Sequence, residues 1–171
     1  MAERSIAVAG PLSGPYWPLA REMGRAVGMA VREHAAQDVR LKVFDDKGDV
    51  GEGERVARAL AGDASCVGVI GHYHSDVTLA AAEVYDAAGL PVIAPVASHP
   101  ALTGRGMRHV FRFTNRDDRT ARAIALHLHH RLGKRSAAVV AARTAYGTSM
   151  AAEFERAFTA LGGRIEDRYD V

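Results

Sequence analysis

The stretch VGVIGHYHSDVTLAAAEVYDAAGLPVIAPVASHP, residues 67–100, determines the fold of this chain. Its apolar runs and helical repeat, divided by Gly and Pro, predict a strand at 66–70, a loop at 71–74, a helix at 75–88, a strand at 90–94 and a loop at 95–100. Each loop follows the carboxyl end of a strand, which is where open α/β sheets bind ligands.

Both of these loops lead to a small hydroxyl residue, Ser75 in the first and Ser98 in the second. Ser75 lies where the helix is predicted to begin, so its hydroxyl and the free N–H groups of the first turn face the same way. This arrangement suits an anionic group such as a carboxylate. The alternative is that both serines are ordinary caps, because Ser is a preferred N-cap residue.

The rest of the chain repeats the same alternation of strand and helix. Further strands are predicted at 5–9, 39–44, 109–113, 136–142 and 164–171, and further helices at 19–36, 52–62, 119–132 and 148–161. This order predicts the α/β class, with a doubly wound parallel sheet and helices on both faces. The helix at 19–36 is expected to turn Met23, Ala26, Val27, Ala30 and Val31 towards the sheet.

The composition is typical of a globular protein, with 48% hydrophobic and 25% charged residues among 171 and a net charge of +2. Because the basic residues are dispersed and only 6% of residues are aromatic, nucleic-acid binding is not expected. The single cysteine, Cys66, begins an apolar strand and is interpreted as a core residue. The N-terminus enters a strand almost at once without a signal peptide, which leaves a cytoplasmic protein or removal of a signal as alternatives.

Several side chains suggest chemistry that the pattern alone does not settle. Asp45 and Asp46 end a strand and suit a metal site or acid–base pair, although turn formation and capping are favoured. Ser75 with His72 or His74 is a candidate nucleophile and base, without an assignable orienting carboxylate or oxyanion loop.

Other signals are weaker or absent. His127 and His130 lack a third ligand, so no metal site is expected. Dinucleotide, P-loop and nucleophile-elbow motifs are absent, and no cofactor is expected. Tyr16 and Trp17, in the loop at 10–18, are interpreted either as a ligand wall or as a lid over the core.

Six segments, in this order and spacing, resemble the branched-chain amino acid binding proteins of ABC transporters, which are type I periplasmic binding proteins. The segments are IAVAGPLSGP (6–15), VFDDKGD (43–49), VIGHYHSDVT (69–78), AGLPVIAPVASHPALTGRG (88–106), VFRFTNRDD (110–118) and VVAARTAYGTSM (139–150). The resemblance implies a two-lobed clamp that closes on an amino acid and docks on a membrane permease. It implies an N-terminal ligand-binding lobe at 1–115 and the beginning of an incomplete second lobe at 116–171.

The resemblance also implies roles for particular residues. Ser75 would hold the ligand carboxylate, Val96 would accept from the ammonium group through its carbonyl, and Ser98 would contact both ends of the zwitterion. The other implied ligand-binding residues are Ala97 through its backbone, Trp17 or Tyr16 as the aromatic wall, His74 beside the serine, and Tyr146 closing from the second lobe.

The resemblance carries three further expectations. A family disulfide between the acidic turn and the serine loop would fall near Gly48 and His74, and this sequence lacks the cysteines for it. The location would be extracytoplasmic. The alternative function is a ligand-sensing regulatory domain of the same fold. Because the chain is expected to end inside the second lobe, it is also expected to expose apolar surface and to form a homodimer.

Overall fold

The computed structural model of the chain describes residues 3–35 and 38–171. Ala36, the predicted last residue of the first long helix, therefore lies outside the described residues. The chain divides into two compact units, Met1–Ala97 with Ala101–Thr114 and Ser98–Pro100 with Asn115–Val171. Each unit is considered separately below.

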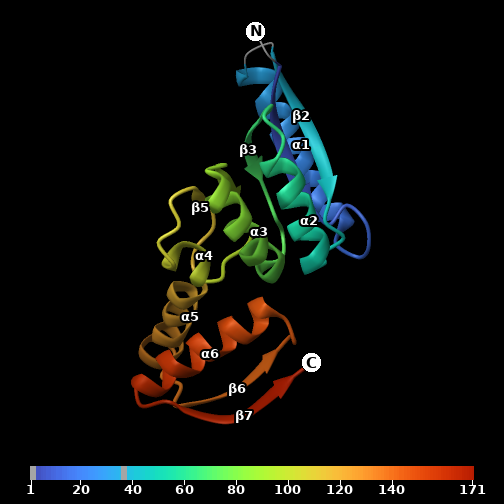
Figure 1. Ribbon diagram of the computed structural model, residues 1–171. Coiled ribbons are helices and arrows are strands. Elements are labelled where there is room, and N and C mark those ends of the chain that lie inside the picture. The colour runs from blue at the N-terminus through green and yellow to red at the C-terminus, as the bar shows by residue number, and fades with distance from the viewer. Residues whose placement is uncertain (1–2, 36–37) are drawn as a thin grey trace. The chain divides into compact units, whose positions relative to one another are not determined.

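The first unit contains a parallel five-stranded sheet with the order β2-β1-β3-β4-β5 (Figure 1). Its strands are β1 (Arg4–Gly10), β2 (Val39–Asp45), β3 (Cys66–Ile70), β4 (Val92–Ala94) and β5 (Val110–Arg112). Its helices are α1 (Trp17–His34), α2 (Val50–Ala61), α3 (Ser75–Ala88) and the short α4 (Ala101–Gly104). The order reverses at β1, so the loops after β1 and β3 lie at the topological switch point of the sheet.

The second unit contains the parallel pair β6 (Ser136–Ala141) and β7 (Arg164–Asp170). Its helices are α5 (Asp117–Leu126) and α6 (Ala145–Ala160), and the segment η1 (His127–Arg131) continues α5 as a π-helix. Phe158 is wholly buried between Ala125 and Ala157 in the core of this unit. The predicted α/β fold with parallel strands is confirmed in both units.

The core of the first unit lies between the sheet and the helices α2 and α3. Alternate residues of the strands, including Ala7, Val69 and Val92, point to this side and are almost fully buried. Leu60 of α2 and Tyr85 of α3 are wholly or nearly buried against them. Cys66 belongs to this core, and its burial raises the pKa of the thiol, so the interpretation of Cys66 as a core residue agrees with its position.

The opposite side of the sheet is covered only in part, by α1. Ala26 and Ala30 of this helix are exposed, so the expected inward face is not fully buried. Ala30 still lies with Val27 and Val31 beside Ile6 and Ile70 of the sheet, in an open hollow. The buried residues of the helix are Ala20 and Gly28, and its main contacts with the sheet are to β1 and β2.

The uncovered side forms a row of apolar residues across the sheet. Val8, Ile70, Ile93 and Phe111 are register partners on successive strands. Val8 is 0% exposed, whereas Ile93 is 41% and Phe111 is 53% exposed. Phe113, just after β5, is 87% exposed, and we call Ile93, Phe111 and Phe113 the exposed stripe.

Several predicted boundaries differ from the structure by a few residues. β4 begins at Val92 rather than Leu90, because Gly89 ends α3 in the left-handed conformation and Leu90 donates back to the Tyr85 carbonyl. α1 begins at Trp17, since Pro18 fits the first turn of a helix. The segment between the second loop and β5 contains the short helix α4. Within the described ranges, no helix combines the length and apolar character that crossing a membrane requires.

Candidate functional site

The loops that follow β1, β2 and β3 are joined by two consecutive aspartates at the end of β2. Asp45 Oδ1 accepts hydrogen bonds from the backbone N–H groups of Leu12 (2.9 Å) and Ser13 (3.3 Å) in the β1 loop, and from Lys47. Partial burial opposes ionisation, but hydrogen bonds from Ser13, Lys47 and Leu12 outweigh it and lower the pKa of Asp45. The carboxylate therefore fixes the β1 loop against the β2 loop.

Asp46 points the other way and is wholly buried. Its Oδ1 accepts from the Gly48 N–H (2.8 Å), and its Oδ2 lies 2.6 Å from Nδ1 of His72 in the β3 loop. These bonds agree with the favoured interpretation of the aspartates as turn-forming residues. Among the described residues, no group of three acidic, histidine or cysteine side chains is arranged to hold a metal ion.

Gly71 allows the β3 loop to lie directly against β1. A Cβ atom added to Gly71 would lie 2.3 Å from the carbonyl oxygen of Ala9, and the residue has φ +154°. Its N–H donates to the Ile93 carbonyl of β4 at 3.0 Å. Only glycine permits this close approach, which sets where the following residues enter α3.

Ser75 is the first residue of α3, and His74 occupies the N-cap position. The interpretation of Ser75 as a cap is therefore wrong by one position, and His74 makes no side-chain cap hydrogen bond. Ser75 is 6% exposed. A hydroxyl in the first turn of a long helix is suited to donate to an anionic group of a ligand.

An aromatic cluster lies beside this helix end. The ring of Tyr16, the N-cap residue of α1, lies 4.7 Å from that of His74 and 5.9 Å from that of Tyr73. Partial burial and then Tyr16 raise the pKa of Tyr73. Tyr16 and Trp17 are both 45% exposed, and the Arg21 guanidinium lies 5.7 Å from the Trp17 ring centroid.

Tyr16 and His74 are thus brought together, and Trp17 is adjacent in sequence on a more open surface. Their contact agrees with an aromatic wall at the β1 and β3 loops. The β2 and β3 loops meet at Gly48, because a Cβ added there would lie 2.9 Å from Cε1 of His74.

The remaining predicted residues follow β4 or belong to the second unit. Val96 is 40% exposed and Ala97 is buried, just beyond the strand that pairs with β3. Ser98 belongs to the second unit, where its carbonyl accepts from the Asp117 N–H at 3.1 Å. Tyr146 lies in α6, is 50% exposed, and lines a cavity of about 400 Å³ along β6.

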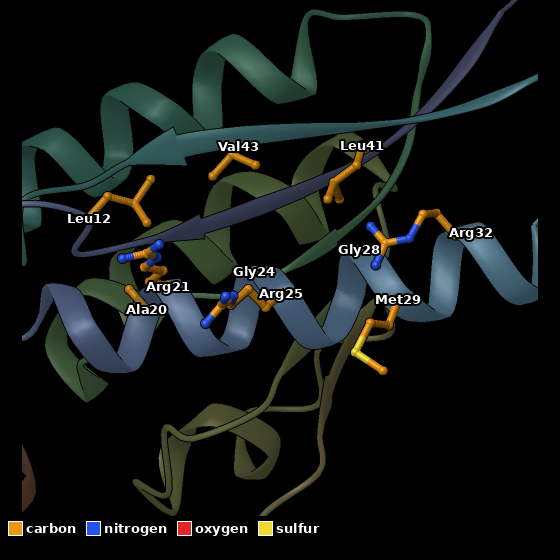
Figure 2. A pocket seen from close by; sticks show the side chains of 10 residues that line it. All are labelled: Leu12, Ala20, Arg21, Gly24, Arg25, Gly28, Met29, Arg32, Leu41 and Val43. Carbon is orange, nitrogen blue, oxygen red and sulfur yellow. The ribbon is translucent and has the colours of Figure 1, made fainter.

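A groove of about 480 Å³ lies between α1 and the edge strand β2 (Figure 2). Figure 2 shows Arg21, Arg25 and Arg32 along the helix, opposite Leu41 and Val43 of the strand. None of the predicted site residues lines this groove. It marks where a glycine-rich helix packs loosely on the sheet.

Sequence reasoning missed a buried chain of polar residues beneath the loops, formed by Asp46, His72 and Tyr85. His72 Nε2 lies 3.1 Å from the Tyr85 hydroxyl, and all three side chains are 0% exposed. The sequence suggests Asp46 as a turn former and His72 as a candidate base, with no link between the two. Tyr85 is 13 residues beyond His72, on the inner face of α3, and the sequence marks it only by its place in the apolar repeat.

The strand order, the switch point and the loops collected there define the fold of a type I periplasmic binding protein lobe. A family model described as "Periplasmic binding protein" matches residues 3–171, and the chain belongs to this family. The predicted resemblance is therefore confirmed.

The similar proteins are substrate-binding proteins. An amino acid binding protein of Pseudomonas aeruginosa is 29% identical over 157 residues, which cover 88% of this chain and 42% of the relative. A Leu/Ile/Val-binding protein homolog of Brucella melitensis is 29% identical, with 99% of this chain and 47% of the relative covered.

Among solved structures, an ABC transporter substrate-binding protein from Desulfitobacterium hafniense in complex with Leu is 30% identical, with a TM-score of 0.80, and the match covers 98% of this chain and 50% of that one. The chain therefore spans about half the length of the relatives that it matches.

Proposed function

We propose that this chain is part of an extracytoplasmic solute-binding protein of an ABC transporter, and that it binds an amino acid or a similar small polar solute without transforming it. The observation that carries the proposal is the position of Ser75, which is 6% exposed and is the first residue of α3, directly after the loop that follows β3. The names of the relatives support the same ligand class. The proposed partner of the complete protein is a membrane permease.

In this proposal the ligand carboxylate is held by the Ser75 hydroxyl and by the N–H groups of the first turn of α3. The Val96 carbonyl accepts from the ammonium group, Ala97 contributes backbone contact, and Ser98 completes the polar ring. Tyr16, Trp17 and His74 form the wall beside the ligand side chain. Tyr146 closes over the ligand from the second lobe.

A Ser–His hydrolase is the less favoured alternative, and the hydrogen bonds of His72 argue against it. Both ring nitrogens of His72 are engaged, one by Asp46 and the other by Tyr85. His72 therefore has no nitrogen left to take a proton from Ser75, which leaves only His74 as the candidate base of this alternative. A sensor domain of the same fold uses the same ligand contacts and differs only in its output partner.

The test is a titration of the ¹⁵N-labelled chain with L-leucine and, separately, with benzoate, which lacks the ammonium group. L-leucine is expected to shift the amide resonances of residues 72–77 and 96–97 in a saturable way. A ligand at a hundred times its Kd also stabilises a protein by about 2.7 kcal/mol, which a thermal melt detects. Weak binding is expected, because a single lobe supplies only one wall of a cleft.

Ser75→Ala is expected to abolish the shifts, whereas Ser136→Ala, an exposed serine of β6, leaves them unchanged. Equal binding by the wild type and Ser75→Ala would remove Ser75 from the site. Hydrolysis of generic esters or amides that is lost in Ser75→Ala would favour the enzyme instead.

We also propose that the 171-residue chain, produced alone, associates as a homodimer. The support is the exposed stripe of Ile93, Phe111 and Phe113, because contiguous apolar surface of this kind is usually covered by another chain segment.

A further inference from the structure

The chain of Asp46, His72 and Tyr85 joins three elements of the first unit inside the protein core. Asp46 follows β2, His72 lies in the loop after β3, and Tyr85 lies near the end of α3. The contacts are 2.6 Å between Asp46 Oδ2 and His72 Nδ1, and 3.1 Å between His72 Nε2 and the Tyr85 hydroxyl oxygen. No atom of the three side chains is exposed to solvent.

When the His72 ring carries a single hydrogen, its two hydrogen-bond partners set which nitrogen holds it. Burial, followed by Cys66 and Asp46, raises the pKa of Tyr85, so its hydroxyl is neutral and has a proton to donate. His72 Nε2 accepts that proton's hydrogen bond, which leaves the ring hydrogen on Nδ1 to be donated to the Asp46 carboxylate. The Gly48 N–H is bonded to the second oxygen of Asp46. The polar side-chain atoms of Asp46, His72 and Tyr85 therefore all have hydrogen-bond partners, as buried groups require.

The hydrogen bonds among Asp46, His72 and Tyr85 restrain the residues before and after Ser75. His72 fixes the loop three residues before it, and Tyr85 belongs to the helix that begins at Ser75. The Asp46 backbone N–H donates to the Gly10 carbonyl at 3.0 Å. The β3 loop, which is bonded to Asp46, is therefore also connected to the end of β1. Any change in the His72 position must therefore move the start of α3 relative to β1 and β2.

We propose that Asp46, His72 and Tyr85 are positioning residues that hold the β3 loop and the first turn of α3 in the geometry required by the ligand. This inference rests on the proposed function, because it takes Ser75 as a ligand-binding residue. None of the three touches the ligand. They act through the placement of Ser75, as second-layer hydrogen bonds orient the groups that bind directly.

The first measurement needs no ligand. Amide hydrogen exchange of the full 171-residue chain is compared between the wild type, Tyr85→Phe and Asp46→Asn. Tyr85→Phe removes only the hydroxyl and leaves His72 Nε2 unpaired, so exchange at residues 71–77 is expected to rise roughly tenfold relative to the rest of the sheet. Asp46→Asn keeps the shape of the side chain and removes its negative charge. It is the second test variant, for the case in which Tyr85→Phe does not fold.

The matched control is Val56→Ala, which truncates a buried apolar side chain of α2 and removes no hydrogen bond of the three residues. It is expected to raise exchange throughout the first unit without selecting residues 71–77. Long-range ¹H–¹⁵N spectra of the wild type are expected to report the Nδ1–H tautomer of His72. A hydrogen on Nε2 of His72 instead of Nδ1 would overturn the proposal. So would a rise in amide exchange that is as uniform in Tyr85→Phe and Asp46→Asn as it is in the control.

The second measurement is binding of L-leucine by amide chemical shift. Tyr85→Phe and Asp46→Asn are expected to weaken binding roughly tenfold, whereas Val56→Ala binds as the wild type does at a temperature where it is folded. If these two variants raise amide exchange selectively at residues 71–77 but bind L-leucine as tightly as the wild type, the three residues do not position the ligand-binding groups. If the wild type responds neither to L-leucine nor to benzoate, the proposed function is rejected, and the exchange data alone decide whether the three residues anchor the loop.

Discussion

At the scale of single residues, Asp45 and Asp46 are adjacent in sequence and perform different tasks. Asp45 bonds to the loop after β1, and Asp46 bonds to the loop after β3. A strand end directs consecutive side chains to opposite sides, so one pair of aspartates can connect three loops. The sequence indicated turn formation here, but it could not reveal His72 as a partner, because the two residues are 26 positions apart.

Asp63 provides a pH-dependent contribution at the other end of the sheet. Its carboxylate lies 2.6 Å from Lys42 Nζ and also accepts from the Ser65 hydroxyl and N–H. Hydrogen bonds from Lys42 and Ser65 lower the pKa of Asp63 from 3.8 to about 2. A lowered folded-state pKa adds stability that is complete above the unfolded-state pKa and disappears as the pH falls through the folded-state value.

Asp63→Asn is therefore expected to reduce the free energy of unfolding at about pH 6, and the difference from the wild type is expected to vanish towards about pH 2. Urea denaturation across this range measures it. Asp167→Asn, which changes an exposed acid of β7, serves as the control. A difference that stays constant with pH would contradict the assigned pKa.

At the scale of elements, the packing of α2 on α3 depends on Gly53. A Cβ atom added there would lie 2.4 Å from Cγ1 of Val77, a short and stiff side chain in the core. Gly24 of α1 offers the opposite case, because an added Cβ atom would meet nothing within 4 Å. Two helical glycines therefore differ in what they contribute.

Gly53→Ala is expected to destabilise the protein by about 1–3 kcal/mol through overpacking. Gly24→Ala is expected to stabilise it by up to about 1 kcal/mol through helix propensity. Chemical denaturation of the two variants against the wild type measures both signs. Destabilisation by Gly24→Ala would mean that the helix needs the glycine for packing after all.

Element order and type were predictable from periodicity, but the inward face of α1 was not. The apolar repeat includes Ala26 and Ala30, yet both are exposed, because the buried residues of the helix are Ala20 and Gly28, and Gly28 lies against Leu41 of β2. Alanine fits either side of a helix, so its pattern does not determine the packing direction. The candidate site residues were predictable mainly through the family resemblance.

At the scale of the whole molecule, the exposed stripe governs how the chain behaves in solution. The register row from Val8 to Phe111 passes from fully buried to half exposed within one side of the first unit. Coverage of this surface lowers the free energy by about 25 cal/mol for each Å² of apolar area removed from water.

Phe111→Ser combined with Phe113→Ser is expected to shift the chain from dimer to monomer in light scattering at high concentration. Met29→Gln, which replaces an apolar residue of α1 that is 54% exposed, is expected to leave the dimer intact. A wild-type chain that stays monomeric at every concentration would contradict the proposed association.

Cys66 has a practical consequence for reporting on the site. The thiol is buried in the core, and its raised pKa keeps it in the unreactive protonated form at neutral pH. A second cysteine introduced at the exposed Val96 would therefore take a maleimide dye selectively, with the native thiol left in place. The labelled protein would then serve as a fluorescent sensor that screens solute libraries directly.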